Sequence, residues 1–312
     1  MPLPTDLRIL FLGTPEFAAI SLQKLISEGA RVVVVVTAPD KPAGRGLHLR
    51  KSAVKEVAEA AGIPVLQPEK LKDPDFLQKL KSFEPDLGIV VAFRMLPEQV
   101  WRMPPMGTFN LHASLLPGYR GAAPIHWAIM RGETETGITT FFLRHEIDTG
   151  DLLLQEKVAI GSEETVGELY DRLQQKGADL VWKTVKGIAA GNLKPFPQDE
   201  RKISLAPKIH RETCRLDPSS GMLELHNQVR GLSPQPGAFL ESEGAVYKIY
   251  KTRPEKDLHE IHTLPGKLFI IRPGVLALSC KDGWLQILEI QPEGKRRMDA
   301  KAFLAGHPVP VL

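Results

Sequence analysis

Hydrophobic and polar positions change their spacing block by block along the first half of the chain. Short runs that are almost wholly apolar, of which RVVVVVT at residues 31–37 is the clearest, are typical of strands buried on both faces of a sheet. Between them, apolar residues recur every three or four positions, as in helices that cover a sheet. We expect strands at residues 7–13, 31–37, 63–67, 86–93 and 107–116, and helices at 14–29, 52–62, 73–83 and 96–103. This order predicts an α/β fold with a doubly wound, mostly parallel, Rossmann-like sheet.

Several helix starts carry a capping signal. Thr14 is suited to cap the first helix, with Pro15 at the first helical position, where the missing backbone N–H is not needed. Asp73 stands in the same capping position before a later helix. Thr165 and Glu168 match a capping box, in which the two side chains satisfy each other's backbone N–H groups. These signals fix where the helices are expected to begin.

The regular alternation ends near residue 120. A helix at residues 123–132, strands at 137–143 and 151–160, and a long helix at 165–191 complete the first domain. Residues 192–207 are rich in proline and charge, which is typical of a linker. Five short strands separated by glycine and proline turns follow at 237–241, 245–253, 266–272, 275–280 and 284–291, and predict a small OB-like β-barrel. We therefore expect two domains, residues 1–191 and 208–312.

The composition is that of a globular protein, with 43% hydrophobic and 25% charged residues in a chain of 312. No apolar run approaches the ~20 residues that a membrane span requires, and the first residues lack the basic stretch of a signal peptide. The two cysteines, Cys214 and Cys280, match no metal-binding spacing, so we expect no metal site and a cytoplasmic protein. No coiled-coil or heptad pattern indicates assembly, which favours a monomer.

The net charge of +3 comes from the C-terminal third. Residues 207–312 contain 15 Lys or Arg and 12 Asp or Glu, whereas the preceding residues contain 25 of each kind. An excess of this size is compatible with an ordinary solvated surface. It gives only weak support to a polyanionic partner such as a nucleic acid.

Several enzyme classes lack their main sequence signal. The chain has no Walker A loop, and AGRGLH at residues 43–48 lacks the third glycine of a dinucleotide fingerprint. The histidine motifs that begin at His145 and His259 lack the HExxH zinc spacing, and Ser114 does not stand in a GxSxG motif. A nicotinamide-dependent oxidoreductase, a zinc hydrolase and a serine hydrolase are therefore disfavoured.

Three polar residues lie where strands of a parallel sheet end. Asn110 and His112 are two positions apart near the end of a predicted strand, so their side chains share one face. The polar loop EIDTGD brings Asp148 to a neighbouring strand end, where ligands bind in such sheets. An amide and an imidazole can stabilise a tetrahedral oxygen, and a carboxylate can help to remove a proton from an ammonium nucleophile. The set suits acyl transfer to an amine without a metal or a covalent intermediate.

Each of these residues also has an ordinary structural interpretation. A single histidine in a strand is often a hydrogen-bonded structural residue. Asn110 can bind backbone, and Asp148 can form an Asx turn within the Asp-Thr-Gly sequence. The spacing alone does not show that the three side chains converge.

Five segments distributed over the chain resemble folate-dependent formyltransferases, and more narrowly the members that act on initiator methionyl-tRNA. They are FLGTPEFA at 11–18, TAPDKPAGRG at 37–46, SLLPGYRGAAPI at 114–125, IDTGD at 147–151 and QPEGKRRM at 291–298. The resemblance implies a formyl transfer from 10-formyltetrahydrofolate to the α-amine of methionine on initiator tRNA. By the same motifs, Asn110 would polarise the formyl oxygen, His112 would stabilise the oxyanion and transfer protons, and Asp148 would hold His112 and help to deprotonate the amine.

The resemblance also implies the folate contacts. These are Ser114, Leu115, Leu116 and Pro117, together with Phe93 and Met95 after the preceding strand. In this second segment the chain departs from the family, because it reads VAFRMLP where the family usually has Tyr-Gly after the alanine. Phe93 therefore lacks a hydroxyl group, and Arg94 occupies a place where the family has a residue free to adopt a positive φ.

Two basic segments would bind the tRNA. The loop at residues 37–52 carries Lys41 and Arg45, with glycines on both sides of the arginine, and can order on an RNA acceptor end. Lys295, Arg296 and Arg297 form a second basic turn that would contact phosphates. Apart from the resemblance, either segment could be an ordinary charged surface loop.

Two other functions are weighed against this one. A formyltransferase of the same superfamily could act on a small amine such as glycinamide ribonucleotide or an amino sugar, but such a substrate does not require the basic C-terminal domain. A non-catalytic RNA-binding protein would not need Asn110, His112 and Asp148 together. Turnover with each acceptor would separate the three functions.

Overall fold

A computed structural model describes residues 3–43, 48–242, 244–255 and 265–311 of the chain. The protein divides into two compact units. Unit 1 comprises Met1–Gly121, Gly137–Val158 and Tyr170–Leu205, and unit 2 comprises Ala122–Thr136, Ala159–Leu169 and Ala206–Leu312. Unit 2 thus includes two segments that precede its main part in the chain, residues 122–136 and 159–169.

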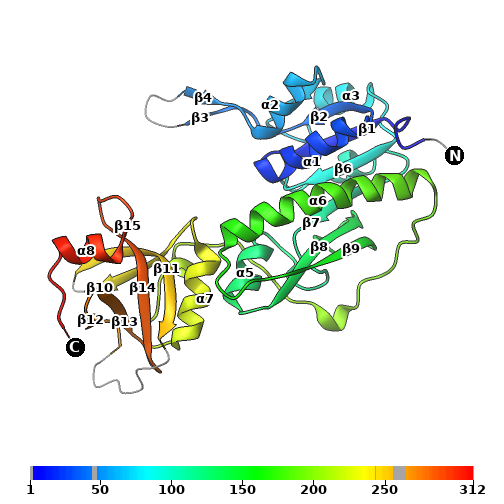
Figure 1. The fold of residues 1–312 in the computed structure, drawn as a ribbon. Coiled ribbons are helices and arrows are strands. Elements are labelled where there is room, and N and C mark those ends of the chain that lie inside the picture. Colours follow the sequence, from blue (N-terminus) through cyan, green and yellow to red (C-terminus); the bar gives the residue numbers. More distant parts are fainter. Residues whose placement is uncertain (1–2, 44–47, 243, 256–264, 312) are drawn as a thin grey trace. The chain divides into compact units, whose positions relative to one another are not determined.

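Unit 1 is built on a seven-stranded sheet with the order β5-β2-β1-β6-β7-β8-β9 (Figure 1). The strands are β1 (Ile9–Gly13), β2 (Val32–Val36), β5 (Val65–Leu66), β6 (Leu87–Val91), β7 (Thr108–His112), β8 (Glu135–Phe142) and β9 (Leu152–Ala159). The first five are parallel to their neighbours, and β8 is antiparallel to β7. The predicted doubly wound, mostly parallel sheet is confirmed.

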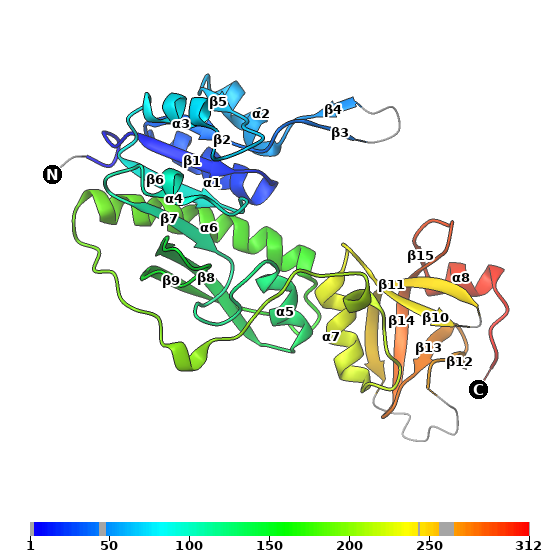
Figure 2. The same ribbon diagram turned by 180° about the vertical axis from the view of Figure 1, so that it is seen from behind.

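Helices cover both faces of this sheet. They are α1 (Glu16–Ser27), α2 (Ala53–Ala60), α3 (Pro74–Lys81), α4 (Glu98–Trp101) and α6 (Val166–Ala189). Both α2 and α3 lie beside β2 in Figures 1 and 2, and Figure 2 also shows them beside β5. On one face, α6 approaches so closely that a Cβ atom on Gly177 would lie 2.8 Å from Leu111 of β7. On the other face, Phe76 and Leu80 of α3 pack in one core cluster with Val90 of β6.

The helix starts test the capping signals. Asp73 accepts hydrogen bonds from the N–H groups of two residues in the first turn of α3, at 2.9 and 3.2 Å. Thr165 and Glu168 form the expected box, because each side chain accepts from the other's backbone N–H, at 3.3 and 2.8 Å. The expectation for Thr14 is wrong. Pro15 itself is the N-cap of α1, and no side chain caps that helix.

The basic segment predicted as a loop at residues 37–52 contains a short hairpin. Its strands are β3 (Lys41–Ala43) and β4 (His48–Arg50), which pair in antiparallel fashion with Lys41 opposite Arg50. We call residues 41–50 the arm. The expected loop is thus partly a regular element that projects from the carboxyl end of β2.

Unit 2 contains a six-stranded antiparallel sheet in the region where the sequence predicts a small OB-like β-barrel. Its strands are β10 (Ala238–Ser242), β11 (Ala245–Glu255), β12 (Leu268–Arg272), β13 (Val275–Ser279), β14 (Trp284–Pro292) and β15 (Met298–Asp299), and its helices are α5 (Pro124–Met130), α7 (Met222–Leu232) and α8 (Ala300–Gly306). The pairing order is β10-β11-β14-β13-β12, with β15 added to β14. No helix was expected at the positions of α7 and α8. In the described part of the chain, no helix combines the length and the apolar character needed to cross a membrane.

Candidate active site

Asn110 and His112 lie on the face of β7 that α6 does not cover. Leu111, between them, faces Gly177 of α6, and successive strand residues point to opposite faces. The His112 side chain is buried, whereas Asn110 is half-buried. Among the residues described, none forms a hydrogen bond with the Asn110 side-chain amide, so this amide is available to a ligand.

The imidazole of His112 is held through one nitrogen. Its Nε2 lies 2.9 Å from the carbonyl oxygen of Tyr119. Since a carbonyl oxygen can only accept, Nε2 carries a proton and donates it. Tyr119 has a φ of 60°, in the left-handed region that is uncommon for a bulky residue, and its N–H donates to Oγ of Ser204 at 2.9 Å. Ser204 therefore supports the turn that orients His112.

The carboxylate of Asp148 faces the other imidazole nitrogen. Its Oδ2 lies 3.8 Å from Nδ1 of His112 and accepts a hydrogen bond of 2.9 Å from the N–H of Gly121. Asp148 also has a left-handed φ of 56°. The distance of 3.8 Å is too long for a hydrogen bond but suits attraction to a protonated imidazole. Two of the three predicted catalytic residues, far apart in the sequence, are thus brought together.

The residues expected to line a folate site after β7 are mostly covered. Ser114, Leu116 and Pro117 are buried, and Oγ of Ser114 donates to the carbonyl of Gly118 at 2.6 Å. Leu115 is partly exposed and lies against Gly137 of β8. In this structure these side chains shape the turn after β7, so any ligand contact in this segment would involve its backbone and Leu115.

The segment after β6 presents one exposed side chain. Met95 is 69% exposed, whereas Phe93 is partly buried against the core of unit 1. Arg94 donates to the carbonyl oxygen of Glu69 at 2.8 Å and to that of Pro68. The positive φ of this segment occurs at Ala92, not at Arg94. The arginine is therefore accommodated without left-handed backbone at its own position.

A cavity of about 440 Å³ lies beside the start of β7. Its lining residues are Trp101, Arg102, Pro104, Pro105, Met106, Gly107, Thr108, Phe142 and Leu143. The hydroxyl of Thr108 is buried and has no hydrogen-bond partner among the described residues. None of the residues predicted to bind folate lines this cavity.

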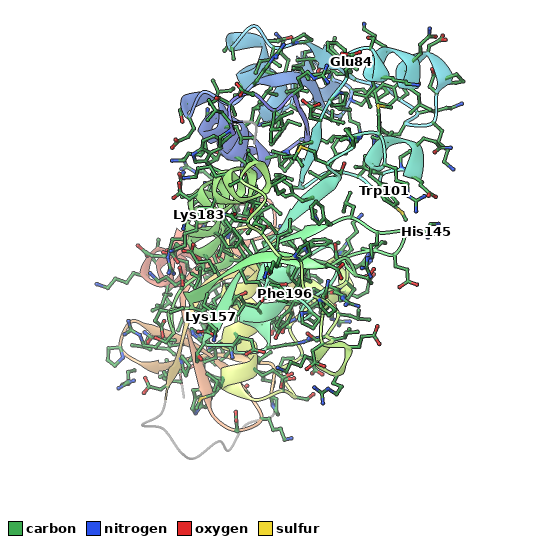
Figure 3. The ribbon with its side chains drawn as sticks, turned by 90° about the vertical axis from the view of Figure 1, so that its right-hand side faces the viewer. Glu84, Trp101, His145, Lys157, Lys183 and Phe196 are labelled. Carbon is green, nitrogen blue, oxygen red and sulfur yellow. The ribbon has the colours of Figure 1, made fainter. Side chains whose placement is uncertain are left out.

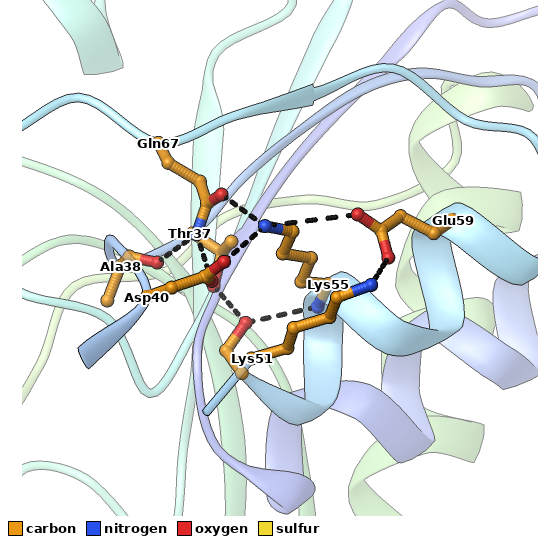
Figure 4. A network of polar contacts seen from close by, with 8 residues as sticks. Thr37, Ala38, Asp40, Lys51, Lys55, Glu59 and Gln67 are labelled. Atoms are coloured by element: carbon orange, nitrogen blue, oxygen red, sulfur yellow. Dashed lines mark hydrogen bonds and ion pairs between the residues drawn. The ribbon is translucent and has the colours of Figure 1, made fainter. Parts of the chain in front are cut away.

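A polar network ties together the two ends of the arm (Figure 4). Nζ of Lys55 lies 2.5 Å from Oδ2 of Asp40 and donates to Oε1 of Gln67 at 2.7 Å. The amide nitrogen of Gln67 donates to the carbonyl of Ala38 and to Oδ1 of Asp40, at 2.7 and 2.8 Å. At the other end, Ser52 hydrogen-bonds to Thr37 at 2.7 Å. We call Thr37, Ala38, Asp40, Ser52, Lys55 and Gln67 the arm root.

The basic residues expected to bind tRNA differ in their surroundings. Lys41, Lys295 and Arg296 are exposed, and Arg45 lies outside the described residues. Arg297 forms an ion pair with Glu289 and stacks over the ring of Tyr250, 4.4 Å from its centroid. Lys295 and Arg296 are therefore more available to a phosphate than Arg297.

The segment expected to be a linker takes part in the site. Phe196, labelled in Figure 3, exchanges backbone hydrogen bonds of 2.8 and 3.0 Å with Leu152 of β9. These bonds place this part of the segment beside β9. Gln198 reaches the backbone of Asp148, and Ser204 reaches Tyr119. Sequence reasoning missed both residues, because a polar side chain in a segment rich in proline and charge carries no periodic signal.

Comparisons with known proteins identify the family of this chain. Residues 7–185 match the formyl transferase family and residues 208–308 match the formyl transferase C-terminal domain. A methionyl-tRNA formyltransferase of Bacteroides fragilis is 47% identical over 311 residues, covering 96% of this chain and 95% of that protein.

Two solved structures share the fold at low identity. The N-formyltransferase of Helicobacter canadensis, crystallised with folinic acid and dTDP-3-aminofucose, has a TM-score of 0.67 and 19% identity, covering 94% of this chain and 100% of that one. HypX of Aquifex aeolicus, in complex with tetrahydrofolic acid, has a TM-score of 0.65 and 21% identity, covering 98% of this chain and 48% of that one. These likenesses show the fold. By the two family models and the 47% identity to the Bacteroides fragilis protein, the chain belongs to the formyl transferase family, together with the methionyl-tRNA formyltransferases.

Proposed function

We propose that this protein transfers the formyl group of 10-formyltetrahydrofolate to the α-amine of methionine on initiator tRNA. The observation that carries the proposal is the similarity, at 47% identity and nearly full length, to a methionyl-tRNA formyltransferase. The approach of Asp148 to His112 in unit 1 supports it independently.

The reaction exchanges one C–N bond for another. The amine nitrogen bonds to the formyl carbon, the bond from that carbon to N10 of the folate breaks, the amine loses a proton and N10 gains one. During the exchange, negative charge develops on the formyl oxygen. Hydrogen-bond donors fixed in advance at that oxygen lower the barrier, because they need no reorganisation.

The residues of β7 supply such groups. We infer that the free amide of Asn110 polarises the formyl oxygen. His112 donates its Nε2 proton to Tyr119, so a second proton on the ring resides at Nδ1, where the Asp148 carboxylate stabilises it. Asp148 would thus stabilise the positive charge that the ring carries once it has taken up a proton in the reaction. Asp148 would also receive the proton of the ammonium group.

We further propose the binding roles of the remaining residues. The folate lies against the segments that contain Ser114, Leu115, Leu116 and Pro117, and Phe93 and Met95. The tRNA contacts Lys41 and Arg45 of the arm and Lys295, Arg296 and Arg297 after β14. Exposure of Met95, Lys41, Lys295 and Arg296 supports these assignments. In functional terms we divide the chain into a catalytic domain (1–191), a connecting segment (192–207) and a tRNA-binding domain (208–312).

We also infer that the protein acts as a monomer in the cytoplasm. Both cysteines are buried free thiols, and burial raises the pKa of Cys280 to about 12, so neither thiol is poised to oxidise. Sedimentation of the purified protein would test the monomer, and a dimer at micromolar concentration would contradict it.

Incubation with labelled 10-formyltetrahydrofolate and charged initiator tRNA tests the proposed function. The expected product is the formylmethionyl ester of that tRNA. Parallel reactions with glycinamide ribonucleotide and with a nucleotide-linked amino sugar test the alternative acceptors. Formylation of a small amine but not of the charged tRNA would overturn the proposal.

A further inference from the structure

Gln198 uses all of its hydrogen-bonding capacity. Its Nε2 donates to the carbonyl oxygens of Asp148 and Gly150, at 2.8 and 2.9 Å. Its Oε1 accepts from Nε and Nη2 of Arg120, at 3.1 and 2.6 Å. A guanidinium group only donates and carbonyl oxygens only accept, so the orientation of the amide follows from its partners. Gln198 is half-buried, whereas the four residues before it are exposed.

The partners of Gln198 belong to the two loops that hold the site. Tyr119 accepts from His112, Gly121 donates to the Asp148 carboxylate, and Arg120 stands between them. We call residues 118–121 the Tyr119 turn and residues 143–151 the Asp148 loop. Gln198 therefore links the turn that orients the imidazole to the loop that carries the carboxylate.

The Asp148 loop needs such support. Asp148 is held in the left-handed region, which costs free energy for a residue with a Cβ atom. At Gly150, the loop backbone lies so close to β8 that a Cβ atom would stand 1.6 Å from the carbonyl oxygen of Phe142. The hydrogen bonds from Gln198 to the carbonyl oxygens of Asp148 and Gly150 oppose a change in this loop conformation. Without them, the carboxylate would move relative to Nδ1 of His112.

We propose that Gln198 is a positioning residue, which sets the placement of the Asp148 carboxylate at His112 by fixing the Asp148 loop to the Tyr119 turn. The inference rests on the proposed function, because it assigns Gln198 an effect on formyl transfer. Gln198 holds the Asp148 loop through backbone carbonyls only and makes no hydrogen bond with the Asp148 carboxylate, which stays available for the reaction.

Two variants separate the contacts of Gln198. In Gln198→Glu, the side chain keeps its length and its partner Arg120, but an oxygen replaces the donor that faces the two carbonyls. In Gln198→Met, a side chain of similar size removes all four hydrogen bonds. The matched control is Gln99→Glu, the same change at an exposed position of α4. Each protein is measured in two ways: hydrogen–deuterium exchange without substrate, and kcat and KM for folate and charged tRNA.

We expect exchange in the Asp148 loop to become about tenfold faster in both variants, with no change in the strands of unit 1. We expect kcat to fall about 10- to 100-fold, while both KM values stay within about threefold. A merely structural role would instead lower the thermal stability and the fraction of active enzyme and leave kcat per active molecule unchanged. The Gln99→Glu control should match the unsubstituted protein.

Unchanged exchange of the Asp148 loop in both variants would overturn the inference. Faster exchange with unchanged kcat would also overturn the inference. Gln198 would then hold the Asp148 loop without affecting the rate of formyl transfer. Absence of formyl transfer by the unsubstituted protein would instead contradict the proposed function. Since exchange is measured without substrate, the two failures are distinguishable.

Discussion

Two glutamines in unit 1 hold two segments between strands in a similar way. Gln67 binds the backbone of Ala38 through its amide nitrogen and a cation, Lys55, through its oxygen. Gln198 binds the backbone of Asp148 through its amide nitrogen and Arg120 through its oxygen. In each case a neutral side chain joins a loop to a cation on another element.

The two places differ in what happens to the nearby carboxylate. At the arm root, the carboxylate itself is bound, and hydrogen bonds from Lys55 and Gln67 hold the pKa of Asp40 below its usual value. At the site, the Gln198 amide contacts Asp148 only at its backbone carbonyl, and the carboxylate keeps a single backbone donor and His112. A glutamine amide therefore binds the carboxylate of Asp40 but not that of Asp148. A carboxylate that anchors a segment has to be bound, whereas one that takes part in a reaction has to stay available.

The largest test exchanges the two carboxylates for amides. We expect Asp148→Asn to lower kcat for formyl transfer by about 1000-fold or more, because a charge that stabilises His112 and accepts a proton is lost. Folding and folate binding should persist. The matched control, Asp40→Asn, should change kcat by less than about threefold. An Asp148→Asn enzyme that keeps most of its rate would remove the role assigned to this carboxylate.

A second test addresses the segment that the arm root supports. Arg45→Ala should raise KM for charged tRNA about tenfold, or lower turnover by a similar factor, since a contact to RNA is lost. KM for folate should not change. Arg31→Ala, an exposed arginine at the start of β2, is the control. Unchanged tRNA kinetics for Arg45→Ala would exclude the arm from the tRNA site.

A third test loosens the arm root without touching the arm. Lys55→Met removes the cation from Asp40 and Gln67 and should raise KM for charged tRNA about threefold, because the arm then samples more orientations. KM for folate and kcat at saturating tRNA should stay the same. Lys79→Met on α3, where the lysine is exposed, serves as the control. If Lys55→Met lowers kcat instead, the arm root would affect the Asp148 loop, and the two places would not have separate structural and catalytic roles.

The smallest expected effect concerns a buried histidine in unit 2. His226 lies 3.0 Å from Oγ1 of Thr252, and burial lowers its pKa from the ordinary 6.5. The unfolded chain then binds a proton more readily than the folded one, so the free energy of unfolding should fall as the pH drops below 6.5. The slope for one proton is at most about 1.4 kcal/mol per pH unit. Denaturant titrations between pH 7 and 5 should show a smaller slope in His226→Gln, and an equal slope would contradict this assignment.

The sheet of unit 1 was predictable because each of its strands is marked by apolar residues. The valine run of β2 and the alternation around Asn110 both reappear as strands. The capping box at Thr165 was equally local and is confirmed. Thr14 misled because a proline can occupy the N-cap position without any side-chain hydrogen bond. The sequence could not show this difference, since both arrangements use the same two residues.

In the candidate site, only the side chains assigned to the reaction itself could be predicted from the sequence. Asn110, His112 and Asp148 stand at strand ends and belong to recognisable motifs. Their supports do not: the carbonyl of Tyr119 has no side-chain signature, and Gln198 lies 50 residues from Asp148. A hydrogen bond between a glutamine and a distant backbone carbonyl depends on how the chain returns to β9, which no local spacing encodes.

The position of Gln198 and Ser204 after α6 affects how such enzymes can be recombined. A chimera that joins two homologues at residue 191 would take both residues from the second parent, while the loops they support come from the first. The activity of such a hybrid would depend on whether Gln198 and Ser204 of one parent still hold the loops of the other, and not only on the exchanged tRNA specificity. A crossover placed after residue 205 would keep each loop with the side chains that hold it.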